Sequence, residues 1–316
     1  MKKFTPLYLL ILSLCLCSCN GNINNSETRF VLNTVATLTA NCSDEVLDGA
    51  FELCKTYENL LSRTNENSTV FALNNSDGFR EIDEETLEII KRAVYFGKLS
   101  DGKFDITILP VSTLWDFNSQ TVPSKDEIAE ALKNVDYEAI EIKENSVNLN
   151  GKKIDLGGIA KGYIADKVKE YLKHHNATEG IVNLGGNVVV FGKEYKVGIK
   201  RPFGDDAIAT LSVKDKSVVT SGIYERYIEK DGRLYHHIID TATGYGVENE
   251  LASVTVIADS SMDCDALSTV CMLSGAKKGS EIINSLENTE AVFVLKNGDY
   301  SFTDGIYEKE KLLYLK

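Results

Sequence analysis

The chain has 316 residues and a mass of 34.9 kDa, enough for one large domain or two ordinary ones. A hydrophobic fraction of 43% and a mean hydropathy of −0.14 are typical of soluble globular proteins, and they exclude a polytopic membrane protein or a disordered chain. The formal net charge of −13 argues against a nucleic-acid partner, because such a chain cannot neutralise phosphates in bulk. A small anionic substrate would need local backbone donors or a metal ion.

The first 18 residues have the features of an export signal. Lys2 and Lys3 precede an apolar stretch, residues 7–16, that is too short to span a bilayer. The sequence LCSC at 16–19 resembles the bacterial lipobox, so we expect lipidation of Cys19 and a tether over 19–27. The alternative is an ordinary secretory signal in which Cys19 is incidental. The lipobox predicts a lipid-anchored protein on the extracytoplasmic face of a cell membrane, periplasmic or at the cell surface.

Four cysteines remain in the body of the chain, at 42, 54, 264 and 271. They form no CxxC pair and have no histidine partners at zinc spacing, which disfavours a metal–thiolate site. Four cysteines in so large a body do not make a disulfide scaffold either. We therefore expect free thiols.

The first elements that the sequence predicts along the chain are helices. Apolar residues at helical spacing predict amphipathic helices over 44–63 and 84–99. Ser124 and Glu127, just after Pro123, form a capping box that opens a short helix.

Turn dipeptides predict three hairpins. Asn-Gly at 150–151 separates 147–149 from Ile154, Asp-Gly at 231–232 separates 224–228 from 235–239, and Asn-Gly at 297–298 separates 291–295 from 300–302. Such frequent hairpins indicate antiparallel sheet mixed with at least five helices. No linker divides residues 28–316, so we expect a single α+β domain there.

Three stretches are unusual for a plain core. Residues 154–163, IDLGGIAKGY, end a predicted strand at Asp155 and turn through two glycines into a helix. Such a turn offers N–H groups to an anion, and Lys161 adds positive charge. The segment is neither a P-loop nor GxGxxG. Alone it is a weak phosphate signal, and a tight structural turn explains it as well.

The second stretch, residues 181–188, is strand-like but contains Gly185 and Gly186, which favours a β-bulge. The third, residues 263–275, predicts a helix stopped by Gly275. There Asp265 and Thr269, four residues apart, share one face. A carboxylate, a hydroxyl and a backbone carbonyl are hard oxygen ligands, and such ligands suit Mg²⁺. A cap by Asp265 with a buried Thr269 is an equal alternative.

Taken together, these stretches resemble the ApbE family, the FAD:protein FMN transferases, over about residues 30–275. Residues 155–163 match its DLGGIAKGY motif, and 265–269 match DALST. The segments FDIT (104–107) with LWDF (114–117), NLGGN (183–187), TSGIYERY (220–227) and HIID (237–240) with TGY (243–245) are similar to further family motifs. Members are typically lipoproteins or exported, which agrees with the lipobox.

The resemblance implies Mg²⁺-dependent transfer of FMN from FAD to a threonine or serine of an acceptor protein in an exported or membrane redox system, with release of AMP. The implied metal ligands are the main chain of Gly158 and the side chains of Asp265 and Thr269. His237 and Asp265 are the implied catalytic residues, with His237 as the candidate for proton transfer. The implied FAD contacts are Leu32, Lys103, Phe104, Asp105, Asp155, Lys161 and Ile239.

The sequence departs from the family pattern in four places. The usual Met-Gly-Thr is Leu-Asn-Thr at 32–34, and Asn187 replaces an aspartate. Thr241 and Gly246 stand where proline is usual, so we expect a looser loop there. Two other functions share these features: an FAD pyrophosphatase, with water as acceptor, and a surface flavin-binding lipoprotein without catalysis. An adhesion or scaffold lipoprotein would bind no flavin.

Overall fold

The computed structural model describes residues 24–309 and 312–315, so the predicted signal and Cys19 lie outside the described residues. Within these ranges no helix is both long and apolar enough to cross a membrane. The first strand begins at Asn25, inside the segment predicted as tether.

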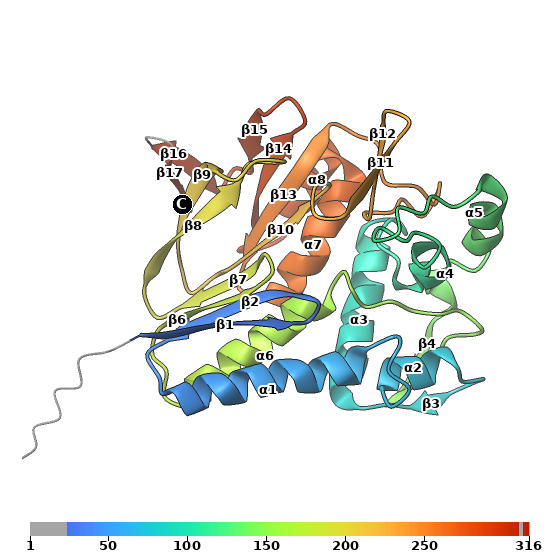
Figure 1. Cartoon of the computed structure of the whole chain (residues 1–316), viewed down its shortest axis with the longest axis horizontal. Coiled ribbons are helices and arrows are strands. Elements are labelled where there is room, and N and C mark those ends of the chain that lie inside the picture. The colour runs from blue at the N-terminus through green and yellow to red at the C-terminus, as the bar shows by residue number, and fades with distance from the viewer. Residues whose placement is uncertain (1–23, 310–311, 316) are drawn as a thin grey trace, which may run out of the picture.

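An antiparallel eight-stranded sheet forms the centre of the molecule (Figure 1). In spatial order its strands are β1 (Asn25–Val31), β2 (Thr34–Ala40), β6 (Gly180–Leu184), β7 (Asn187–Phe191), β10 (Ser217–Gly222), β13 (Leu251–Ala258), β14 (Glu290–Leu295) and β15 (Tyr300–Phe302). Every residue of β13 is buried, because both faces of the sheet are covered there.

Helices cover one face of this sheet and a smaller sheet covers the other. The helices are α1 (Asp44–Leu61), α6 (Ala160–His174), α7 (Ser261–Ser274) and α8 (Ala276–Asn284). The four-stranded sheet contains, in spatial order, β16 (Ile306–Lys309), β17 (Leu312–Leu315), β9 (Ala207–Lys214) and β8 (Glu194–Lys200). The two faces bury separate hydrophobic clusters.

The remaining elements lie beside the helical layer (Figure 1). They are α2 (Thr69–Asn74), α3 (Glu84–Leu99), α4 (Leu109–Ser112), α5 (Lys125–Leu132), two 3₁₀ turns at Ile106–Ile108 and Tyr137–Ala139, β3 (Arg80–Glu81), β4 (Glu141–Lys143), β5 (Ser146–Asn148), and the hairpin of β11 (Tyr227–Lys230) and β12 (Arg233–His236). A third hydrophobic cluster, centred on Trp115, joins α4 and α5 to this hairpin.

Most predicted elements are confirmed, and so is the α+β class with antiparallel sheets. The helices over 44–63 and 84–99 are α1 and α3, and the capping box of Ser124 and Glu127 opens α5. The hairpins at 231–232 and 297–298 are present. All four body cysteines are free, and three of them are buried.

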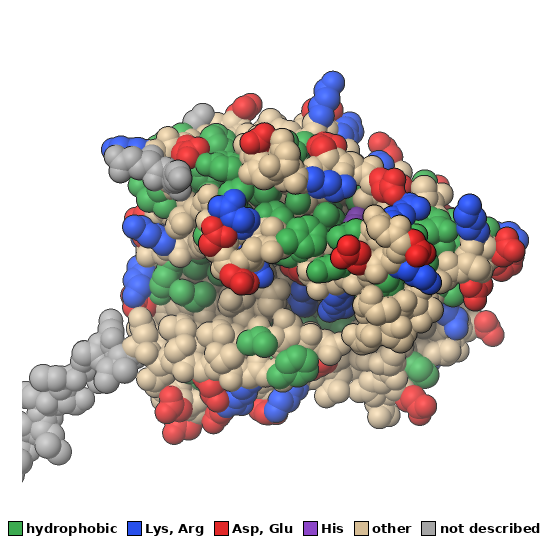
Figure 2. Space-filling model, turned by 45° about the horizontal axis from the view of Figure 1, so that its top comes forward, with side chains coloured by type: hydrophobic (Ala, Val, Ile, Leu, Met, Phe, Trp, Pro, Cys, Tyr) green, Lys and Arg blue, Asp and Glu red, His purple; other side chains and the backbone are tan. Residues whose placement is uncertain are grey.

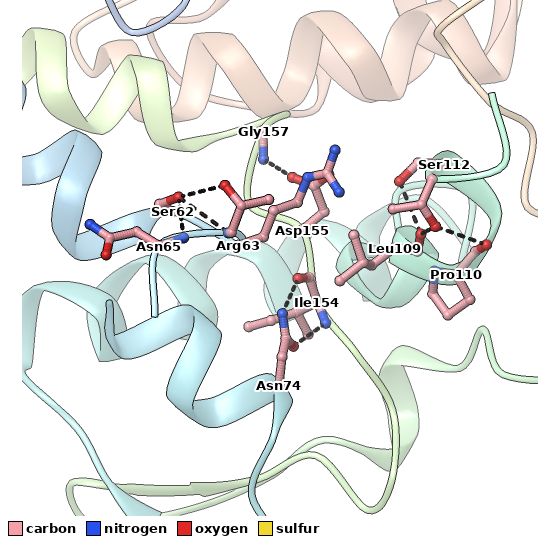
Figure 3. A network of polar contacts seen from close by, with 12 residues as sticks. Ser62, Arg63, Asn65, Asn74, Leu109, Pro110, Ser112, Ile154, Asp155 and Gly157 are labelled. Atoms are coloured by element: carbon pink, nitrogen blue, oxygen red, sulfur yellow. Dashed lines mark hydrogen bonds and ion pairs between the residues drawn. The ribbon is translucent and has the colours of Figure 1, made fainter. Parts of the chain in front are cut away.

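The hairpin predicted at Asn150-Gly151 is wrong. The strand before it, β5, pairs with β4 and β3 instead. The chain after the turn reaches Ile154 without a strand partner, because the side chain of Asn74 takes that place. It accepts from the Ile154 N–H (2.7 Å) and donates to the Ile154 carbonyl (2.9 Å; Figure 3).

The β-bulge expected at Gly185-Gly186 is also wrong. The two glycines are the two-residue turn of the β6–β7 hairpin, with φ of 63° and 100°. Glycine suits this turn because both positions have positive φ.

Candidate active site

The first and third unusual stretches meet where α6 crosses α7. The backbone N–H of Gly162, in the first turn of α6, donates to Oδ2 of Asp265 on α7 (2.9 Å). A Cβ at Gly162 would overlap the carbonyl oxygen of Ser261, so only glycine permits so close an approach of the two helices. The contact fixes one oxygen of the predicted metal ligand.

Asp265 is a buried carboxylate, only 6% exposed. Burial raises its pKa, while the charge of Lys161 and the Gly162 N–H oppose that rise. The amide of Asn187 also favours the ionised form, although its Nδ2 has no hydrogen-bond partner of good geometry. Asp265 forms no ion pair within the described ranges. A bound cation would therefore stabilise the ionised form of this buried carboxylate.

The other two predicted ligands have free oxygen lone pairs. Thr269 Oγ1 makes only long contacts, 3.4 Å each, to Ser221 Oγ and to the Asp265 carbonyl. No hydrogen bond from a described residue reaches the carbonyl of Gly158, because the Gly162 N–H that would usually bond it turns to Asp265 instead. A carboxylate, a hydroxyl and a carbonyl are a donor set that fits Mg²⁺.

The turn before α6 offers fewer free amides than its glycines suggest. The Gly157 N–H donates to Asp155, and those of Ile159 and Ala160 donate to the Leu156 carbonyl. The Gly162 N–H is taken by Asp265. Anion binding at this turn therefore depends on Lys161 and a metal ion more than on the helix terminus.

His237 follows strand β12 and approaches the same region. Its Nδ1 lies 3.3 Å from the Arg226 carbonyl, which can only accept, so Nδ1 carries the proton and Nε2 is the free base. Burial, together with the charges of Arg226 and Lys161, lowers the pKa of His237 to about 4. The imidazole is therefore neutral at pH 7. The neighbouring His236 is structural, with Nε2 bound to the Val247 carbonyl (3.0 Å).

Glu225 is a site residue that the sequence analysis did not single out. Burial raises the pKa of its carboxyl, and the charges of Lys161 and Arg226 oppose this rise. A Cβ at Gly186 would lie 3.9 Å from Glu225 Oε1, so the side chain stands over the β6–β7 turn. Nothing in the spacing of the TSGIYERY segment indicates this position.

Asp155 and Asp105, two of the predicted flavin contacts, are hydrogen-bonded to the loops around the site. Asp155 accepts from Gly157 and pairs with Arg63 Nε at 3.3 Å (Figure 3). Arg63 was not anticipated, because it lies far from Asp155 in the sequence. The buried carboxylate of Asp105 is fully engaged by the N–H and hydroxyl of Thr107 (2.7 and 2.6 Å) and the Tyr137 N–H (3.0 Å). The neighbouring turn is held as well, because the N–H groups of Lys103 and Phe104 donate to the carbonyl and Oγ of Ser100 (3.3 and 2.9 Å).

The remaining predicted contacts take three positions. Phe104 is buried, and its ring would lie 3.2 Å from a Cβ at Gly158. Ile239 packs in the third hydrophobic cluster. Leu32 starts the β1–β2 turn, where Leu32 and Asn33 have φ of 56° and 59°. Asparagine tolerates this conformation as glycine does, which explains the departure from Met-Gly-Thr.

The loop expected to be loose is held in place. The Thr241 hydroxyl donates to the Gly102 carbonyl (3.0 Å), and Ile239 forms a β-bridge with Gly246. Trp115 Nε1 donates to the Gly244 carbonyl (3.1 Å). These bonds replace the stiffness that prolines would give.

One face of the molecule is hollowed between these elements. Figure 2 shows the hollow with Lys and Arg side chains on its floor and hydrophobic side chains above it. Positive charge inside a net-acidic molecule suits a small anionic ligand.

Known proteins share both the sequence and the fold. Residues 31–293 match the model of the ApbE family. An FAD:protein FMN transferase of Klebsiella pneumoniae is 37% identical over 81% of this chain and 84% of its own, and one of Treponema pallidum is 32% identical over 84% and 82%.

The similar solved structures include the ApbE protein of Thermotoga maritima and the flavinyl transferase ApbE of Pseudomonas stutzeri. The first has a TM-score of 0.82 at 34% identity and covers 89% of this chain and 97% of its own. The second has a TM-score of 0.78 at 25% identity and covers 89% and 95%. This chain therefore belongs to the ApbE family.

Proposed function

We propose that this protein transfers FMN from FAD to a threonine or serine hydroxyl of an acceptor protein, with Mg²⁺ as cofactor and AMP as the second product. Its relatives in Klebsiella and Treponema carry the name FAD:protein FMN transferase. The observation that carries the proposal is the buried Asp265, which shares a helix face with Thr269 and accepts from the Gly162 N–H in the first turn of α6.

Asp265, Thr269 and the Gly158 carbonyl would hold the metal. Bound there, Mg²⁺ would act as a Lewis acid and neutralise charge on the pyrophosphate oxygens. Lys161 adds a second positive charge beside Asp265, so it is placed to bind the same phosphates.

His237 supplies the base. Nε2 takes the proton from the acceptor hydroxyl, whose oxygen then attacks the phosphorus on the FMN side. A new P–O bond joins FMN to the acceptor, and the P–O bond to the bridging oxygen breaks. That oxygen leaves with AMP. The Arg226 carbonyl holds the ring in the tautomer that leaves Nε2 free.

The test uses FAD, MgCl₂ and a purified exported redox protein as acceptor, with the acceptor mass as readout. We expect a gain of one FMN, lost when EDTA replaces Mg²⁺. Free FMN and AMP without acceptor modification would identify water as the acceptor and the protein as a pyrophosphatase. Bound but intact FAD would reduce the protein to a flavin carrier.

The anchor on Cys19, and a location on the extracytoplasmic face of the membrane, belong to the same proposal. They are supported by the LCSC sequence at 16–19 behind an apolar stretch.

A further inference from the structure

A group of three aromatic side chains, two of them exposed and one half-buried, lies beside the site. Phe203, Tyr224 and Tyr227 form it, and we call it the aromatic platform. The Phe203 ring makes edge-to-face contacts with Tyr224 (5.9 Å between centroids) and Tyr227 (5.6 Å). Phe203 is 56% exposed and Tyr227 37%. Neither ring belongs to the three hydrophobic clusters of the fold.

The loop that carries Phe203 holds its ring in an exposed position. Phe203 lies between β8 and β9 with φ of 56°, a costly conformation for a bulky residue. Arg201 closes the loop at its base, since its N–H donates to the Asp206 carbonyl (2.9 Å) and its side chain pairs with the Asp206 carboxylate (2.9 Å). The fold thus maintains a strained, exposed ring that contributes little to the core.

The platform is continuous with the proposed base. Tyr227 pairs with His236 across the β11–β12 hairpin, one residue before His237. Arg226, next to Tyr227, supplies the carbonyl that holds His237. Paired strand residues lie about 5 Å apart and consecutive residues about 4 Å, so the backbones of Tyr227 and His237 lie within about 10 Å of each other. At about 3.4 Å per residue, an extended peptide spans this distance in three residues.

We propose that the aromatic platform binds the acceptor protein, through an apolar side chain two to four residues from the hydroxyl that receives FMN. This inference rests on the proposed function. A protein acceptor must bring its hydroxyl to His237, so its neighbouring residues must pass over the surface beside it. Large flat rings are the side chains that most often dominate such contacts. The expected FAD contacts around Phe104, Asp155 and Lys161 do not include the platform.

The probe is a library of 15-residue peptides with a central threonine and randomised flanks. The library is incubated with FAD and Mg²⁺, and peptides that gain FMN are sequenced by mass spectrometry. We expect enrichment of apolar residues two to four positions from the threonine. Phe203→Ala should abolish this enrichment and raise the KM for a selected peptide about tenfold or more, with the Kd for FAD unchanged.

Two further variants exclude trivial explanations. Phe79→Ala removes an exposed phenylalanine (42%) next to β3 and should keep the enrichment. Phe203→Gly removes the ring and also relieves the positive φ, so its Tm should not fall while peptide affinity does. A weaker Kd for FAD in Phe203→Ala would assign the platform to the flavin and overturn the proposal, as would enrichment that survives in this variant.

A binding measurement without FAD distinguishes a failure of FMN transfer from a failure of peptide docking. If no peptide gains FMN, the proposed function fails on this probe. Retention of the same library on immobilised enzyme then decides the platform. Retained apolar peptides that are lost with Phe203→Ala support docking. Equal retention by both proteins contradicts it.

Discussion

Burial acts in opposite directions on Asp265 and His237, two titratable groups of the site. It raises the pKa of Asp265 and lowers that of His237, so each is driven toward its neutral form. For the histidine the neutral form is the active base. For the aspartate the neutral form cannot bind a cation, so the carboxylate gains most from a metal ion. The same buried environment thus favours a neutral His237 that can accept a proton, and an Asp265 carboxylate that is stabilised by binding Mg²⁺.

The first prediction concerns pH and corrects an expectation from the unperturbed histidine pKa. That value, near 6.5, predicts a rate that rises through neutrality. With the pKa of His237 lowered to about 4, the ring is already neutral at pH 6. With saturating Mg²⁺, transfer should be nearly constant from pH 6 to 8 and fall as pH approaches 4. A bound cation lowers the pKa further and leaves this sign unchanged. A rise centred near pH 6.5 would contradict it.

Replacing the base tests the same assignment. His237→Ala should reduce transfer by roughly 10²–10⁴-fold, the usual contribution of a positioned base. FAD and Mg²⁺ should still bind, as measured by flavin fluorescence and metal titration. His236→Ala is unsuitable as a control because that ring is buried and hydrogen-bonded.

Metal rescue separates Asp265 from His237. Asp265→Asn removes the charge but keeps the shape, so it should weaken Mg²⁺ binding, and raised Mg²⁺ should restore part of the activity. Asp263→Asn is the matched control on the same helix, since Asp263 pairs with Arg92 (2.6 Å) outside the site. Unchanged Mg²⁺ affinity in Asp265→Asn, or metal rescue of His237→Ala, would reverse the two roles.

The sequence predicted those site residues whose interactions are local in the chain, and missed those whose partners are distant in the chain. Asp265 and Thr269 were placed on one face because helix geometry is local. Asn74 and Arg63 were missed because their partners, Ile154 and Asp155, lie about 80 residues or more away. Only the tertiary fold brings such pairs together.

At the scale of elements, α6 and α7 cap each other. Asp166 Oδ2 on α6 accepts from the N–H groups of Ser261 (2.7 Å) and Met262 (3.1 Å) at the start of α7. Asp265 on α7 accepts from the first turn of α6. Each acid lies at the positive end of the other helix, which stabilises its charge. This exchange fixes α7, which carries Asp265 and Thr269, against the start of α6, which directly follows the turn at Gly158.

Asp166→Asn should therefore affect both stability and metal binding. Loss of a charged cap costs about 1 kcal/mol, seen as a lower free energy of unfolding in urea. Because α7 then loses one constraint against α6, Mg²⁺ affinity should also fall, by less than in Asp265→Asn. Asp206→Asn, which loses a surface ion pair with Arg201, is the control. A stability loss with unchanged Mg²⁺ affinity would make the cap purely structural.

Turn chemistry predicted some hairpins and failed at others for a physical reason. Dipeptides such as Asp-Gly specify a local reversal, and at 231–232 the two flanking strands pair. At 150–151 the reversal occurs, with φ of 48° and 76°, but the partner of β5 is the strand before it. A turn fixes the direction of the chain. The strand partner depends on which edge is free.

At the scale of the whole molecule, the site lies where independent layers meet. The predicted metal ligands lie on α7 and in the turn before α6, whereas His237 and the aromatic platform come from strand ends and loops. The sequence predicted the antiparallel α+β class from its hairpins. The sequence did not predict the order of the strands in the central sheet, because β2 and β6 pair across 139 intervening residues, nor did it predict the second sheet on the outer face.

The last prediction tests the proposed lipid anchor at Cys19. Strand β1 begins at Asn25, only six residues after Cys19, so the tether spans about 20 Å when fully extended. Cys19→Ala should release the protein from the membrane fraction without lowering its Tm, because the core begins after the tether. Cys17→Ala, two residues earlier, should remain anchored. Mass spectrometry of the amino terminus checks for the lipid. Equal membrane retention of both variants would show that Cys19 is not the anchor.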